Sequence, residues 1–179
     1  MKKLLFIACL LQTVPGMAQE LDEGGFNPSL RGSVMMAYSH IPQASQSGKS
    51  VAVIPTWGFD LDYIFHPKWS LCTQADIKMQ SFEVEEDEVV VERSYPFSLA
   101  LLGHFRPFRH WSFFAGPGIE FESSRNLWIF KIGAEYSFEI SETFEIGVGL
   151  MYENREEVYD GLTFGVSFNT RLWQRRERL

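Results

Sequence analysis

The sequence predicts an all-β fold, an eight-stranded antiparallel up-and-down transmembrane β-barrel, on three observations. Apolar and polar residues alternate with a period of two, most cleanly from Trp111 to Trp173, as in strands whose two faces meet different surroundings. Along residues 128–140 one face is apolar and the other carries full charges. The connections between alternating segments are short and long in turn. A barrel in lipid has this layout, with apolar side chains outside and polar ones within.

The first 18 residues predict a bacterial signal peptide. Lys2 and Lys3 precede an apolar run, and the small residues around Ala18 suit cleavage after that residue. The alternative is a lipoprotein signal with Cys9 as the lipidated residue, although the residues before Cys9 match a lipobox poorly. Residues 19–28 then form a lead into the first strand.

Composition limits the remaining choices. After cleavage Cys72 is the one cysteine, so no intramolecular disulfide is expected in an oxidising compartment. Loss of Lys2 and Lys3 takes the formal charge from −7 to −9, which argues against nucleic acid as a partner. No later segment reaches the run of about 20 apolar residues that a membrane helix needs. A mature chain that spans a membrane must therefore do so with strands.

Eight segments have the period-two character, and each is long enough for the roughly 9–11 residues of a tilted membrane strand. They are residues 29–39, 51–65, 69–82, 91–105, 111–122, 127–140, 143–153 and 161–173. Three connections are short, at 66–68, 106–110 and 141–142, and proline lies in two of them. The others are more polar and mostly longer, and one of them contains the acidic run 83–88. An even number of strands brings both termini to one side, which we expect to be the periplasm.

The two faces agree from strand to strand. Alternation places residues such as Phe130, Ile132 and Phe138 on the lipid side, with tryptophan and tyrosine near strand ends, where interfacial girdles lie. The lumen is predicted to hold an ion-pair network, because isolated charges in a confined space are costly. Its members are Arg31, Asp60, Asp62, Asp76, Lys78, Arg93, Glu120, Lys131, Glu135, Glu139, Glu145 and Arg171. The alternative use of these carboxylates is to line a narrow path for protons, cations or small solutes.

The mature chain resembles the small eight-stranded outer-membrane β-barrel proteins of Gram-negative bacteria. The resemblance rests on the signal peptide, the strand meander, the segment 113–120 and the closing strand that begins at Gly161. It implies a monomer in the outer membrane with periplasmic termini, in contact with membrane lipids and lipopolysaccharide and inserted by the barrel assembly machinery. The chain departs from the pattern after Trp173, where the basic tail 174–179 follows.

Candidate chemistry is sparse. His110 and Ser112 resemble the His-x-Ser pair of outer-membrane lipid A deacylases, with Glu120 further along the same strand. Glu120 should lie about 26 Å away at 3.3 Å per strand residue, however. The acidic run 83–88 could be solvated, or could bind Ca²⁺ or Mg²⁺ that bridges to lipopolysaccharide. The four histidines lack the spacing of a zinc site, and we expect neither a metal nor a cofactor.

The sequence therefore predicts an outer-membrane barrel with a structural or surface-interaction role and no enzymatic activity. Three alternatives remain open: a lipid-modifying outer-membrane enzyme like the lipid A deacylases, a narrow channel for small solutes, and a soluble periplasmic barrel of the lipocalin kind. The aromatic outer face argues against the last.

Overall fold

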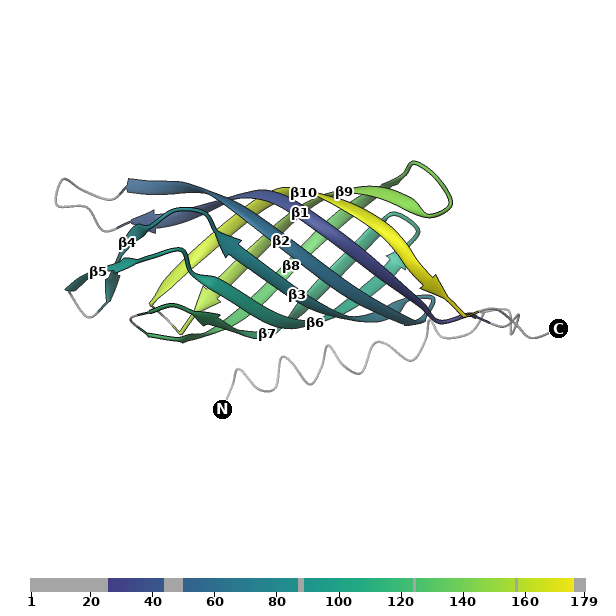
Figure 1. Cartoon of the computed structure of the whole chain (residues 1–179), viewed down its shortest axis with the longest axis horizontal. Helices are drawn as coiled ribbons and strands as arrows, with labels where there is room; N and C mark the ends of the chain where they lie inside the picture. The colour runs from purple at the N-terminus through teal and green to yellow at the C-terminus, as the bar shows by residue number, and fades with distance from the viewer. Residues whose placement is uncertain (1–25, 44–49, 87–88, 124, 157, 176–179) are drawn as a thin grey trace, which may run out of the picture.

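The computed structural model describes residues 26–43, 50–86, 89–123, 125–156 and 158–175. Eight strands form a closed antiparallel barrel in the order β1-β10-β9-β8-β7-β6-β3-β2 (Figure 1). The barrel strands are β1 (Ser29–Gln43), β2 (Ser50–His66), β3 (Trp69–Lys78), β6 (Phe97–Phe108), β7 (Trp111–Phe121), β8 (Leu127–Glu139), β9 (Phe144–Arg155) and β10 (Tyr159–Gln174). The predicted fold class is confirmed. Within the described residues no helix has the length and apolar character needed to cross a membrane.

The two ends of the barrel differ. At one end β1 begins with Ser29 and β10 ends with Gln174, and these two residues pair with one another. The tight β2–β3, β6–β7 and β8–β9 connections lie at the same end (Figure 1). We call this the terminal end. The opposite end carries a separate two-stranded hairpin of β4 (Phe82–Glu86) and β5 (Val89–Arg93). We call this the hairpin end.

The β4–β5 hairpin corrects two predicted strands. Segment 69–82 was expected to be one strand but β3 ends at Lys78, and segment 91–105 divides into β5 and β6. The break before β6 has a local cause, because Tyr95 has a φ of 46° and Pro96, which has no N–H, follows it. Residues 83–86 of the acidic run are therefore in a strand, and the hairpin directs Phe82 and Val84 into the mouth of the barrel.

The turn between β6 and β7 is shorter than expected. Residues 106–110 were predicted as a connection, but β6 continues to Phe108 and only Arg109 and His110 separate the strands. The β6–β7 register shifts between Phe105 and Phe108, so Pro107 occupies an irregularity where a missing N–H costs no ladder hydrogen bond. Arg106 consequently belongs to a strand and its side chain can reach the lumen.

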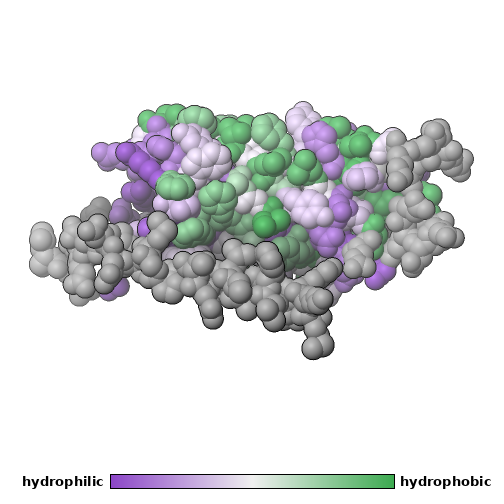
Figure 2. All heavy atoms as spheres, turned by 180° about the vertical axis from the view of Figure 1, so that it is seen from behind, coloured by the Kyte–Doolittle hydropathy of each residue, from purple (hydrophilic) through white to green (hydrophobic). Residues whose placement is uncertain are grey.

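Apolar side chains cover the outside of the barrel. Phe130, Ile132 and Phe138 of β8 are 49%, 50% and 51% exposed, whereas Lys131 between them is 0% exposed. Figure 2 shows hydrophobic residues over much of one face, with hydrophilic residues gathering toward the ends. Exposed aromatic residues lie toward both ends of the barrel. Those toward the hairpin end are Tyr38, Trp128 and Tyr152, and those toward the terminal end are Tyr63, Trp69, Trp111 and Trp173. The predicted assignment of faces therefore matches the structure.

Gly116 of β7 permits a close approach between neighbouring strands. A Cβ atom built on Gly116 would lie 2.0 Å from the backbone oxygen of Leu101 on β6. The next residue, Pro117, has no N–H for the ladder. We expect Gly116→Ala to destabilise the barrel by about 1–3 kcal/mol, the range for overpacking, in a urea titration of the folded barrel. Gly103→Ala is the matched control, because its nearest contact would be an ordinary 3.9 Å; equal losses in the two variants would contradict the prediction.

Candidate functional site

The lumen at the hairpin end holds a buried ion-pair cluster centred on Glu120 of β7. Its carboxylate accepts hydrogen bonds from Arg93 Nη2 at 3.0 Å, Arg155 Nε at 2.5 Å and the Tyr159 hydroxyl at 2.5 Å. Arg93 also lies 3.2 Å from a carboxylate oxygen of Glu122. The Arg155 guanidinium lies over the Tyr159 ring, 4.6 Å from its centroid. The cluster therefore ties the barrel wall to the base of the hairpin, since Arg93 ends β5.

A second part of this network surrounds Lys131 of β8. Its ammonium group pairs with Asp76, donates to Gln74 Oε1 and Ser98 Oγ at 3.0 Å each, and lies 3.4 Å from Glu153. Lys78 lies 3.8 Å from Asp76 and 3.5 Å from Glu153, and Arg155 lies 3.1 Å from Glu153. In all, four cations face four carboxylates: Lys78, Arg93, Lys131 and Arg155 against Asp76, Glu120, Glu122 and Glu153. We call this set the upper network.

A smaller set of ion pairs lies toward the terminal end. Asp62 accepts from Arg31 at 3.1 Å and from Arg106 at 2.5 Å, and Arg31 also donates to Glu145 at 3.2 Å. The Asp62 side chain is buried, and the two arginines retain limited exposure. Here too the charges balance, with two cations against two carboxylates. We call these four residues the lower network.

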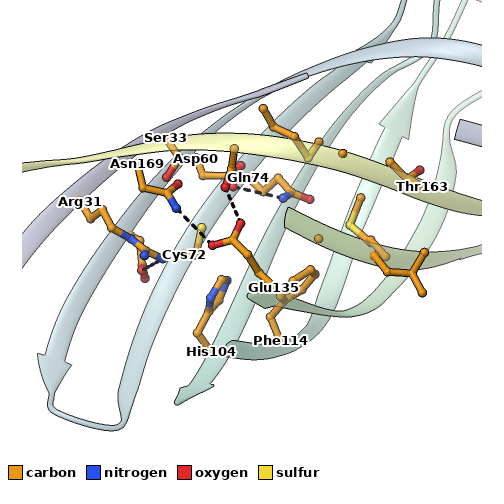
Figure 3. Close-up of a pocket in the computed structure, with 17 residues that line it drawn as sticks. Arg31, Ser33, Asp60, Cys72, Gln74, His104, Phe114, Glu135, Thr163 and Asn169 are labelled. Atoms are coloured by element: carbon orange, nitrogen blue, oxygen red, sulfur yellow. Dashed lines mark hydrogen bonds and ion pairs between the residues drawn. The ribbon is translucent and has the colours of Figure 1, made fainter. Parts of the chain in front are cut away.

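Between the two networks is a small internal cavity (Figure 3) of about 30 Å³. Asp60, Glu135 and His104 line it, with Arg31 and Asn169 on the side toward the lower network. Below it, a vestibule of about 210 Å³ is lined by Arg31, Arg106, Ser112, Asn169 and others at the terminal end. Because Arg31 and Asn169 line both spaces, the cavity adjoins the vestibule.

An apolar cluster covers the upper network at the hairpin end. It consists of Ile41, Ile54, Phe82, Val84, Leu127 and Tyr159. Phe82 meets the Tyr159 ring edge to face at a centroid distance of 5.6 Å. An eight-stranded barrel has room for its own side chains or one small ligand. In this barrel the apolar cluster and the upper network occupy the lumen at the hairpin end, and space for a ligand lies toward the terminal end.

Most of the residues predicted to form the lumenal network do face the lumen. Eight of them make ion pairs there: Arg31, Asp62, Asp76, Lys78, Arg93, Glu120, Lys131 and Glu145. Asp60 and Glu135 line the cavity, and among the described residues neither makes an ion pair. Two lie elsewhere. Glu139 pairs with Arg109 on the exposed surface at the end of β8, and Arg171, also exposed, bonds Gln174 at 3.3 Å. Both positions have the correct parity but fall beyond the enclosed part of the lumen.

The sequence prediction left three members of the site, Arg106, Arg155 and Tyr159, outside the predicted strands. The predicted connections 106–110 and 154–160 contained them, yet all three belong to strands. A signal was present, since Arg155 continues the inward parity of Glu153, and Arg106 that of His104. Extending each alternation by two residues would have found both arginines.

The structure does not assemble a catalytic site from the His-x-Ser candidates His110 and Ser112 among the described residues. Ser112 Oγ is hydrogen-bonded to His104 Nδ1 at 3.1 Å, while His110 Nδ1 donates to the backbone oxygen of Ser137 at 3.1 Å. Glu120 is engaged by Arg93, Arg155 and Tyr159 at the other end of β7. Thus His110, Ser112 and Glu120 each have separate partners, and no carboxylate orients a histidine toward the serine among the described contacts.

Comparison with known proteins finds similar folds among solved structures. No protein-family model matches the sequence, and the search of curated proteins finds no match. Among solved structures, Ail, the attachment invasion locus protein of Yersinia pestis, is similar with a TM-score of 0.54 and 15% identity, over 83% of this chain and 100% of that one. Neisserial surface protein A has a TM-score of 0.56 and 8% identity, over 81% of this chain and 99% of that one.

The fold is that of the small eight-stranded outer-membrane β-barrels. The closed ladder and the apolar outer face of this chain are the features that such a barrel needs to satisfy its backbone hydrogen bonds in lipid. The similarity covers the barrel as a whole and concerns its architecture. The chemistry of the lumen and of the two ends follows from the residues of this chain.

Proposed function

We propose that this protein is a closed outer-membrane barrel that acts as a rigid anchor, without enzymatic activity, and presents its hairpin end as a contact surface outside the cell. The observation that carries the proposal is the filled lumen. The upper network and the apolar cluster together occupy the barrel interior beneath the hairpin end. A pore through these buried ion pairs would require several of them to separate at once, which is costly in a low-dielectric interior.

The proposed orientation follows from the two ends. Outer-membrane barrels have short periplasmic turns and longer outer loops. In this chain the short turns lie at the terminal end, with the start of β1 and the end of β10 (Figure 1). We therefore place the terminal end in the periplasm and the β4–β5 hairpin outside. The proposal also includes export by the signal peptide 1–18. These residues lie outside the described residues, as do residues 176–179 of the basic tail 174–179.

The charge of the hairpin end bears on the kind of partner. Glu83 and Glu92 pair across the β4–β5 hairpin and are both exposed, and the sequence adds Glu85, Glu86, Asp87 and Glu88 in the same segment. Ail is described in complex with the heparin analogue sucrose octasulfate. An acidic hairpin repels such a polyanion, so we propose that the surface contact of this chain is with a basic region of a partner protein.

The test of a closed barrel is conductance. We expect the refolded full chain in a planar bilayer to give no single-channel events, because the upper network and the apolar cluster block the lumen. Stable cation-selective steps would contradict the anchor role and favour the channel alternative. A mass spectrum of lipid A from expressing cells tests the remaining alternative, since loss of a defined acyl chain would favour an enzyme.

The orientation is tested in the same expressing cells. Glu92→Cys should react with a membrane-impermeant maleimide on intact cells, whereas Glu142→Cys in the β8–β9 turn should react only after lysis. Cys72 is buried, so background labelling should be low. Labelling of the turn variant and not the hairpin variant on intact cells would reverse the proposed orientation.

A further inference from the structure

Among the described residues of the lumen, two carboxylates make no ion pair with a lysine or arginine. The upper network balances four cations against four carboxylates, and the lower network balances two against two. Asp60 of β2 and Glu135 of β8 lie between them, and among the described residues neither makes an ion pair with a lysine or arginine. Uncompensated charge within a barrel surrounded by lipid is expensive.

The two carboxylates are not equally stabilised. Glu135 accepts three hydrogen bonds, from Ser167 Oγ at 2.6 Å and from Asn169 Nδ2 and Ser137 Oγ at 3.2 Å each. A carboxylate with two or three donors is well stabilised as an anion. Asp60 accepts one long bond from Gln74 Nε2, at 3.4 Å to Oδ2, and its Oδ1 atom is buried without a hydrogen-bond partner. Asp60 is therefore the carboxylate whose negative charge is least compensated by its neighbours.

The cavity supplies the space for a compensating group (Figure 3). Its volume of about 30 Å³ is enough for one water molecule or one small ion. His104 also lines it, is 8% exposed, and has a buried Nε2 atom without a hydrogen-bond partner. Asp60 Oδ1 and His104 Nε2 thus border the same space, which is also lined by Arg31 and Asp62, each with one further buried atom that has no hydrogen-bond partner.

We propose that the barrel binds one small monovalent cation at Asp60 Oδ1, beside Glu135, in this internal cavity. The cation is a proton or an alkali-metal ion, and either adds the single positive charge that Asp60 lacks. The titratable and charged groups around it are Arg31 from β1, Asp62 on β2 itself, Cys72 and Asp76 from β3, His104 from β6, and Lys131 and Glu135 from β8. The adjoining vestibule gives access from the terminal end.

The site is tested with Asp60→Asn, which keeps the shape of the side chain and removes the need for a cation. Urea unfolding of the full chain in phospholipid vesicles is measured from about pH 5 to about pH 8, in sodium, potassium or N-methylglucamine chloride at equal ionic strength. Glu139→Gln is the matched control, because this carboxylate is exposed and pairs with Arg109. It should respond to pH and to cations as the wild type does.

The two cations predict different results. If a proton binds, the folded wild type holds a proton that an unfolded aspartate has lost above about pH 4. The unfolding equilibrium constant then rises with pH, by up to about tenfold per pH unit, and Asp60→Asn loses this part of the slope. If an alkali-metal ion binds, sodium or potassium stabilises the wild type relative to N-methylglucamine, and Asp60→Asn is insensitive to the exchange. Equal responses of the wild type and Asp60→Asn to both pH and cation would overturn the proposal.

A measurement on the wild type alone covers the case in which Asp60→Asn does not fold. A bound proton should give the infrared carbonyl band of a buried carboxylic acid at neutral pH, and a bound alkali ion should give sodium-23 relaxation that excess potassium reverses. A folded wild-type barrel with neither signal would overturn the site. Neither result depends on the surface role of the hairpin end, so the two proposals fail independently.

Discussion

Replacement of Arg155 by methionine is expected to destabilise the barrel by about 3–5 kcal/mol, the range for removing one partner of a buried ion pair. Arg155 is 0% exposed and contacts both Glu120, at 2.5 Å, and Glu153, at 3.1 Å. Methionine fills much of the volume but leaves the upper network with one carboxylate in excess. Urea titration of the refolded barrel in vesicles measures the loss.

Two further variants show whether charge is the cause. Arg109→Met removes an exposed partner of Glu139 and should leave the urea midpoint unchanged, because exposed pairs contribute little. The double variant Arg155→Met with Glu120→Gln should recover part of the stability, since it removes the orphaned negative charge together with the cation. If Arg155→Met were as stable as the wild type, the upper network would not depend on this cation.

The second large loss of stability is expected from a substitution on the outer face of the barrel. Ile132 of β8 is 50% exposed and pairs with Ala115 on β7 and Tyr152 on β9, so it lies on the outside of the barrel between the two aromatic girdles. Ile132→Arg should cost about 2–4 kcal/mol, because that is the depth-dependent penalty for arginine on a lipid-facing site near mid-bilayer. The yield of folded barrel in vesicles and its urea midpoint both report the loss.

Ser137→Arg provides the comparison for Ile132→Arg within one strand. Ser137 has the inward parity and lines the vestibule at the terminal end, beside Glu135. An arginine there has water and a carboxylate within reach, so the variant should assemble with a smaller loss. Comparable losses from the two variants would mean that the inside and outside of β8 are wrongly assigned.

The alternation of residues was sufficient to assign the two faces of the wall. Side chains of a strand point to opposite sides in turn, so the chemistry of Phe130, Lys131 and Ile132 identifies which side meets lipid without knowledge of any neighbour. The up-and-down order of neighbouring strands followed from the segments and their short connections. These are local properties, and the structure agrees with them.

The hairpin end was harder to predict because β4 and β5 form a separate two-stranded sheet and do not pair with the barrel strands. The alternation of residues 69–82 runs on past Lys78, where β3 ends, and that of residues 91–105 spans the break at Tyr95. Period-two patterning is the same for a strand in the wall and for a strand in a hairpin folded over the mouth. The pattern therefore predicted strand in both places and could not show the change of direction.

The sequence alone determined the parity of side chains within each predicted strand, because parity is a local property. Only the tertiary structure decided which of them meet. Lys131 of β8 pairs with Asp76 of β3 across the lumen, and Arg31 of β1 bridges Asp62 of β2 and Glu145 of β9. Such pairs depend on the tilt and stagger of closed strands, which set the height of each residue along the barrel axis. For the same reason, only the tertiary structure shows that the carboxylate of Asp60 has no ion-pair partner among the described residues.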